Sequence, residues 1–144
     1  MPKDNRNFFK EKKIWSGVKD ELLGCYLVPY FSKVFSMNNP ILYIDCFAGK
    51  GKFDDGKNGS PLTAIESLQK SISVRKDNTP LPLVNMKFIE LNHAGELERN
   101  LLTQTFGEYE IINGAFEEKI IPILKKARSE IRNCNVFLYI DPWN

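Results

Sequence analysis

Short apolar segments alternate with segments of helical periodicity through most of this sequence. The apolar segments occupy 41–47, 83–91, 109–113 and 135–144, and the helical segments occupy 60–73, 94–106 and 117–132. Apolar runs without polar alternation are typical of strands that are covered on both faces. Successive parallel strands need a crossover connection, which the intervening helices supply. The alternation therefore predicts an α/β fold, a parallel sheet with helices on both faces.

A helical segment precedes the first of these strands. Between residues 10 and 35, apolar side chains recur at steps of three and four residues, namely Ile14, Val18, Leu22, Cys25 and Tyr26. Pro29 is expected to kink or interrupt this helix, and Trp15 is expected to pack in the core. We therefore divide the chain into an N-terminal helical extension, 1–40, and a sheet domain, 41–144.

Composition and charge exclude several classes of protein. The chain has 144 residues, a net charge of +2 and 42% hydrophobic residues, and no apolar run approaches the roughly 20 residues that cross a bilayer. The N-terminus lacks the apolar region of a secretory signal. The three cysteines have no CxxC spacing, which predicts reduced thiols and no metal site. We expect a cytoplasmic protein without membrane contact.

Three of the four apolar segments end on or beside an acid, Asp45, Glu90 or Asp141. The carboxyl ends of parallel strands meet at one rim of the sheet, which is where open α/β sheets bind ligands. Gly49 and Gly51 follow the first acid, and glycine lets the backbone approach a ligand closely and adopt positive φ. The pattern predicts a ligand site at this rim.

The residue types at the rim indicate the kind of ligand. Glu90 is placed to accept hydrogen bonds from two ribose hydroxyls, and Asp45 could take the ammonium of an amino acid. The loop from Gly51 to Ser60 is long for a dinucleotide site, in which a helix follows at once to hold the pyrophosphate. A nucleoside joined to an amino acid, as in S-adenosylmethionine, meets these demands.

Each of these acids also has a purely structural interpretation. Asp45 could cap the following turn, Glu90 could be an ordinary acid at a strand end, and Asp141 could belong to a turn that ends its strand. Ser60 followed by Pro61 predicts a helix start with Ser60 at the N-cap.

The same motifs resemble a known family. "DCFAGKG", "FIEL" and "YIDPWN" resemble the successive strand-end motifs of class I S-adenosylmethionine-dependent methyltransferases. Trp15 and Lys19, followed by "YIDCFAGKGKF" and "GSPLTAI", resemble more narrowly the three-Cys-motif partner protein family. The resemblance extends from about Trp15 to Pro142. It implies a Rossmann-like fold with S-adenosylmethionine as cofactor.

The resemblance also implies roles for single residues at three turns. Asp45, Ala48, Gly49 and Gly51 would line the methionine end, Glu90 the ribose, and Ala115 and Phe116 the adenine, with Phe47 and Leu91 completing the cofactor-binding set. Ala115 occupies the position at which an acid often holds the adenine amino group. "DPWN" resembles the motif of amine-modifying methyltransferases, which makes Asp141, Pro142 and Trp143 the candidate catalytic residues. The family's usual continuation is instead Asp-Pro-Phe-Gly.

These expectations lead to one function and two alternatives. The first is an S-adenosylmethionine-dependent methyltransferase, or its cofactor-binding portion, whose acceptor is unknown and could be nucleic acid, since the N-terminus is mildly basic. The second is a non-catalytic α/β partner or binding module, and the third, weaker one is a nucleotide-dependent oxidoreductase. Class I methyltransferases build more strands than four, so we expect a Rossmann-like sheet truncated after the fourth strand. Its exposed edge would call for a partner protein or a homodimer to cover it.

Overall fold

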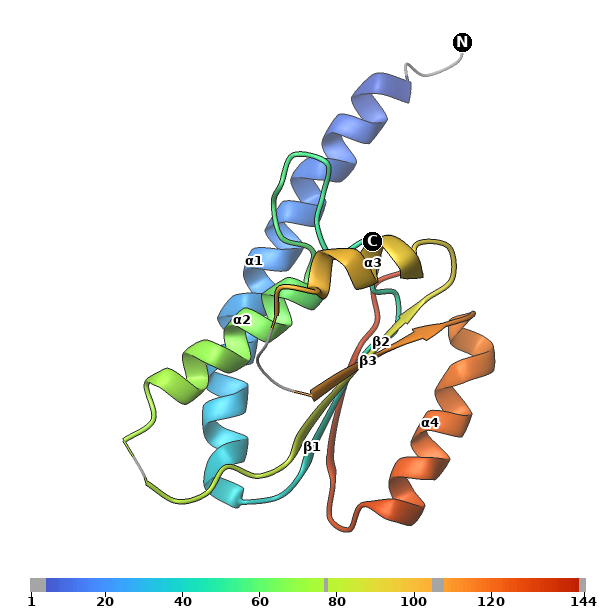
Figure 1. Cartoon of the computed structure of the whole chain (residues 1–144). Helices are drawn as coiled ribbons and strands as arrows, with labels where there is room; N and C mark the ends of the chain where they lie inside the picture. Colours follow the sequence, from blue (N-terminus) through green and yellow to red (C-terminus); the bar gives the residue numbers. More distant parts are fainter. Residues whose placement is uncertain (1–4, 77, 105–107, 143–144) are drawn as a thin grey trace.

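The computed structural model describes residues 5–76, 78–104 and 108–142, with side chains described from residue 14 onward (Figure 1). Helices and strands alternate along these ranges, as the sequence predicts. The elements are α1 (Asn5–Met37), β1 (Ile41–Asp45), α2 (Ser60–Ser73), β2 (Val84–Glu90), α3 (Ala94–Leu101), β3 (Glu108–Asn113), α4 (Phe116–Glu130) and β4 (Asn135–Tyr139).

The four strands form one parallel sheet in the order β3-β2-β1-β4. The register places Asp45, the last residue of β1, between Phe88 of β2 and Tyr139 of β4. The chain adds β2 and β3 on one side of β1 and then returns to place β4 on the other side. The point at which strand order reverses therefore lies between the carboxyl ends of β1 and β4, which is the expected ligand crevice of such a sheet.

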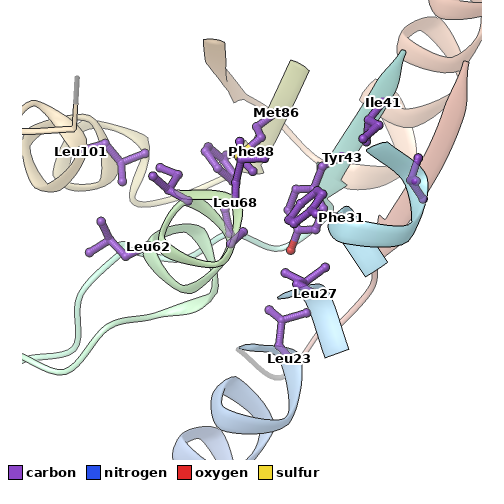
Figure 2. Packing of buried hydrophobic residues seen from close by; sticks show 14 of the residues in the cluster. Leu23, Leu27, Phe31, Ile41, Tyr43, Leu62, Leu68, Met86, Phe88 and Leu101 are labelled. Atoms are coloured by element: carbon purple, nitrogen blue, oxygen red, sulfur yellow. The ribbon is translucent and has the colours of Figure 1, made fainter. Parts of the chain in front are cut away.

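Helices cover both faces of the sheet, which confirms the predicted α/β, Rossmann-like architecture (Figure 1). On one face, α1, α2 and α3 pack against side chains that include Tyr43 and Phe88, and Figure 2 shows Leu23, Leu27 and Phe31 of α1 next to Tyr43. On the other face, α4 packs through Ile120 and Ala127. None of the described helices is both long and apolar enough to cross a membrane.

The first helix differs from the expectation in three ways. It continues through Pro29 to Met37, so of the two effects expected of Pro29, a kink or an interruption, the interruption does not occur. The stripe that marked it as helical is on its exposed side, where Ile14, Val18, Leu22 and Tyr26 are between 41 and 65% exposed. Trp15, expected in the core, is 64% exposed.

The buried face of α1 is instead formed by Asp20, Leu23, Leu27, Phe31 and Val34. Because these residues enter the main core, the boundary at residue 40 does not separate two cores. Only the N-terminal part of α1 extends beyond the sheet (Figure 1).

Strand position in the sheet explains the burial of the strands. All five residues of β1, one of the two inner strands, are buried. β4 forms an edge of the sheet, and its side chains alternate. Phe137 packs against the α1 side, whereas Val136, Leu138 and Ile140 are 39 to 53% exposed. The fourth strand is therefore an apolar edge, as expected.

Candidate functional site

The loop after β1 forms one wall of the site, and glycines fix its course. Gly49 and Gly51 have φ angles of +71° and +84°, a region that L side chains rarely adopt. A Cβ at Gly51 would also lie 2.9 Å from Leu97 Cδ1. The Gly59 N–H donates to Gly51 O at 2.8 Å, and Asn100 Nδ2 donates to Lys50 O at 2.7 Å. The loop is thus closed on itself and attached to α3.

Glu90 connects this loop to the end of β2. Its Oε2 accepts the Gly49 N–H at 2.6 Å, and its Oε1 accepts the Asn92 N–H at 3.1 Å. The structure therefore brings together two residues, Gly49 and Glu90, that the sequence placed in one site. Each carboxylate oxygen has a second lone pair, so Glu90 keeps acceptor capacity for a ligand.

Asp45 is fully buried. Its Oδ2 accepts the Ser60 hydroxyl at 2.5 Å, and its Oδ1 accepts the Phe47 N–H at 3.3 Å. Burial raises the pKa of Asp45 to about 7, and the bonds from Ser60 and Phe47 oppose this shift. In this conformation Asp45 caps the turn, the interpretation left open by the sequence. Ser60 is not an N-cap, because α2 begins at Ser60 with Gly59 before it.

Two further acids, Asp20 of α1 and Asp141 after β4, interact electrostatically with Asp45. We call Asp20, Asp45 and Asp141 the acid corner. Lys19 Nζ lies 3.1 Å from Asp141 Oδ1 and 3.4 Å from its Oδ2, and only 12% of the Asp141 side chain is exposed. Lys19, named in the sequence only through a resemblance, therefore joins α1 to the rim.

Asp20 is the residue of this corner that sequence reasoning missed. It is 8% exposed, and no described residue donates a hydrogen bond to its buried Oδ2. The pKa of Asp20 is raised to about 7, mainly by burial and then by Asp141, against a lowering by Lys19. The signal was available, since Asp20 precedes Leu23, Leu27 and Phe31 at helical spacing and so marks an acid on a core-facing stripe.

A cavity of about 920 Å³ lies between α1, the loop after β1 and α2. Its lining includes Asp20 and Gly24 of α1, the predicted site residues Ala48, Gly49 and Gly51, and Ser67 of α2. Among the described residues, Asp45, Glu90 and Asp141 do not line it. Gly49 therefore both lines the cavity and donates its N–H to Glu90.

The remaining predicted site residues lie toward α4. The rings of Phe47 and Phe116 are 5.2 Å apart, and both pack with the α4 side of the core. Ala115 is the N-cap residue of α4, and Leu91 is 57% exposed. After β4, Pro142 is exposed. Trp143, the third candidate catalytic residue, lies outside the described residues.

No cluster of His, Cys, Asp and Glu suited to a metal ion occurs among the described residues. No protein-family model matches the chain, and no curated protein or solved structure matches it either. Any function is therefore argued from the geometry of the rim and the cavity.

Proposed function

We propose that this chain is the cofactor-binding part of an S-adenosylmethionine-dependent methyltransferase. The observation that carries the proposal is the hydrogen bond from the Gly49 N–H to Glu90 Oε2, which fixes a glycine turn and a carboxylate side by side at the ends of β1 and β2. This rim adjoins the point where strand order reverses, between β1 and β4. Such rims are where open α/β sheets bind nucleosides.

The residues at the rim fit the parts of this cofactor. Glu90 has lone pairs left for two ribose hydroxyls. The glycine turn does not lead directly into a helix, since α2 begins only at Ser60, so no helix N-terminus is offered there to a pyrophosphate. The neighbouring cavity, about 920 Å³, is within the usual range of ligand pockets. These features favour a nucleoside without a pyrophosphate over a dinucleotide.

In this proposal the cofactor supplies the methyl group, and the chain orients the two reactants. Glu90 holds the ribose, and Phe47 and Phe116 lie toward the adenine. Asp141, held by Lys19 at 3.1 Å, accepts hydrogens from an amine acceptor beside Pro142. Catalysis then comes mainly from positioning rather than from strong acid or base groups. The acceptor is unidentified, and nucleic acid is the class that the motif favours.

The apolar edge of the sheet favours a second candidate, a non-catalytic module that binds a partner protein or a second copy. Val136, Leu138 and Ile140 form an exposed apolar row on β4, and an open apolar edge is a template for pairing with another chain. The two candidates differ in one measurable respect, because only the first transfers a methyl group.

The proposal is tested by calorimetric titration of S-adenosylhomocysteine into the wild-type chain, Glu90→Gln and Glu98→Gln. We expect one-site binding that Glu90→Gln weakens about 10- to 100-fold, since charge-assisted hydrogen bonds to the ribose are lost. Glu98 is an exposed acid on α3, so Glu98→Gln should bind like the wild type. Incubation with methyl-labelled cofactor and pools of RNA, DNA and protein then tests transfer.

Three outcomes would change this assignment. A folded wild-type chain that does not bind S-adenosylhomocysteine would contradict the proposed cofactor. Competition by NAD would favour the oxidoreductase. Binding without transfer to any pool would favour the non-catalytic module.

A further inference from the structure

Asp20 is a buried acid whose charge is only partly balanced by a nearby cation, Lys19. Its side chain is 92% buried, since only 8% is exposed, and its Oδ2 has no hydrogen-bond donor among the described residues. A buried carboxylate without a partner is costly, by several kcal/mol or more in the charged form. Such a group is uncommon in a folded protein and therefore requires an explanation.

The charged groups near Asp20 make hydrogen bonds or ion pairs with other residues. Asp45 accepts the hydroxyl of Ser60 and the N–H of Phe47. Lys19, the next residue in the chain, directs its Nζ to Asp141 at 3.1 and 3.4 Å. Within the acid corner, Asp20 is therefore the acid for which no donor is described.

The position of Asp20 indicates where a donor would enter. Asp20 lines the cavity of about 920 Å³, beside Gly49 and Gly51. The described residues offer no cluster suited to a metal ion, so the missing partner is better supplied by an organic cation. A primary ammonium carries three N–H donors and a positive charge on a compact group.

We propose that this cavity binds the primary ammonium group of a ligand, with the Asp20 carboxylate as its acceptor. The ammonium has two possible sources, the amino-acid end of S-adenosylmethionine or an amine substrate. For the first source the inference rests on the proposed function. In either case Asp20 takes the role that the sequence assigned to the buried Asp45.

Charged and titratable groups surround Asp20 on several elements and affect the pH dependence of binding. Those that interact electrostatically with Asp20 are Lys19, Tyr43, Asp45, Tyr139 and Asp141. Those that line the same cavity are Glu21, Lys50, Lys52, Asp54, Asp55, Lys57, Glu66, Lys70 and His93. Because the pKa of Asp20 is raised to about 7, an entering ammonium displaces a proton from it at neutral pH. Affinity for the ammonium should therefore rise from pH 6 to pH 8 in the wild type.

The test uses three probes on the wild-type chain, Asp20→Asn and Glu98→Gln, with binding followed by calorimetry and by amide chemical shifts. S-adenosylhomocysteine carries nucleoside and ammonium, 5′-methylthioadenosine carries the same nucleoside without the amino-acid end, and spermidine carries ammonium without nucleoside. Asp20→Asn keeps the size of the side chain, and circular dichroism checks its folding. Glu98 is an exposed acid on α3 that does not line the cavity, so Glu98→Gln is the matched control.

If the cofactor supplies the ammonium, Asp20→Asn should lower the affinity for S-adenosylhomocysteine about 10- to 100-fold. The substitution should leave the affinity for 5′-methylthioadenosine unchanged. It should also abolish the rise in affinity for S-adenosylhomocysteine from pH 6 to pH 8. Glu98→Gln should change affinity less than about threefold, as expected for an exposed charge outside the cavity.

The other outcomes separate this inference from the proposed function. If the wild-type chain binds neither nucleoside but binds spermidine through Asp20, the proposed cofactor is refuted and an ammonium site for an amine substrate is supported. The inference is overturned if Asp20→Asn changes the affinity for neither ammonium-bearing probe. It is also overturned if the substitution lowers the affinity for both nucleosides equally.

Discussion

Asp20 and Asp45 have the same side chain and nearly the same burial, but their surroundings give them different roles. Asp45 receives hydrogen bonds from Ser60 and from the Phe47 N–H, so it holds the turn after β1 against the start of α2. Asp20 has no described donor for its Oδ2 and lines a cavity. A satisfied buried acid serves the structure, whereas an unsatisfied one is the better candidate for binding.

The raised pKa of Asp20 predicts how stability depends on pH. Because burial raises the pKa of Asp20 from its ordinary value of 3.8 to about 7 in the folded chain, the folded state binds this proton more tightly than the unfolded state. The free energy of unfolding therefore falls as pH rises from about 4 to 7. Asp20→Asn removes this contribution. The free energy of unfolding of the variant should therefore exceed that of the wild type at pH 8 by at most about 4 kcal/mol and equal it at pH 4.

Urea unfolding of both chains at pH 4, 6 and 8 measures this difference. Asp45, whose pKa is raised as well, should leave some pH dependence in the variant. Equal pH dependence in the two chains would contradict an ionised, unpaired Asp20 at pH 8.

At the scale of elements, the loop after β1 positions the site because several contacts fix it, and two of its glycines allow those contacts to be separated. Gly51 and Gly56 have similar φ angles, +84° and +82°. A Cβ at Gly51 would meet Leu97, which is fully buried, whereas a Cβ at Gly56 would meet nothing within 4 Å. Backbone strain is thus common to both positions, and the contact is not.

We expect Gly56→Ala to lower the free energy of unfolding by about 1 kcal/mol, through strain alone. Gly51→Ala should lower it by about 2–4 kcal/mol, because the buried Leu97 side chain must also move. Urea unfolding of the two variants measures the difference. Equal losses of unfolding free energy in the two variants would mean that the Leu97 side chain moves without cost and that its contact with Gly51 does not fix the loop.

At the scale of the whole molecule, α1 completes both the core and the site. Leu23, Leu27 and Phe31 pack on the sheet, and Lys19 pairs with Asp141 across 122 positions of sequence. The first helix and the end of β4 are thereby joined over the ends of the strands. Removing this ion pair should loosen α1 and leave three acids together without their cation.

Lys19→Met is therefore expected to lower the free energy of unfolding by about 1–2 kcal/mol at pH 8, since Asp141 is then left without this cation in a largely buried setting. The loss should diminish toward pH 4 as Asp20 and Asp45, whose pKa values are raised, bind protons. Amide hydrogen exchange should become faster in α1 around residue 19. Lys33→Met, at an exposed position of the same helix, should show neither effect, and an unchanged exchange rate in Lys19→Met would refute the role of the pair.

The alternation of apolar and helical segments by itself determined the parallel α/β fold, because local periodicity reports which faces of a segment are buried. It also determined that Asp45, Glu90 and Asp141 lie at or just after strand ends. For α1 the same periodicity identified a helix but the wrong buried face, since Ile14, Leu22 and Tyr26 are exposed.

Only the tertiary structure decided which acid is satisfied and which is not. Ser60 meets Asp45, Lys19 meets Asp141 and the Gly49 N–H meets Glu90, and each pair joins residues far apart in sequence. Hydrogen-bond satisfaction depends on distances of a few ångströms between such residues, and spacing along the chain does not contain them. For that reason the sequence could name the acids of the rim, while the fold revealed Asp20 as an acid that lines a cavity and has no described donor for its Oδ2.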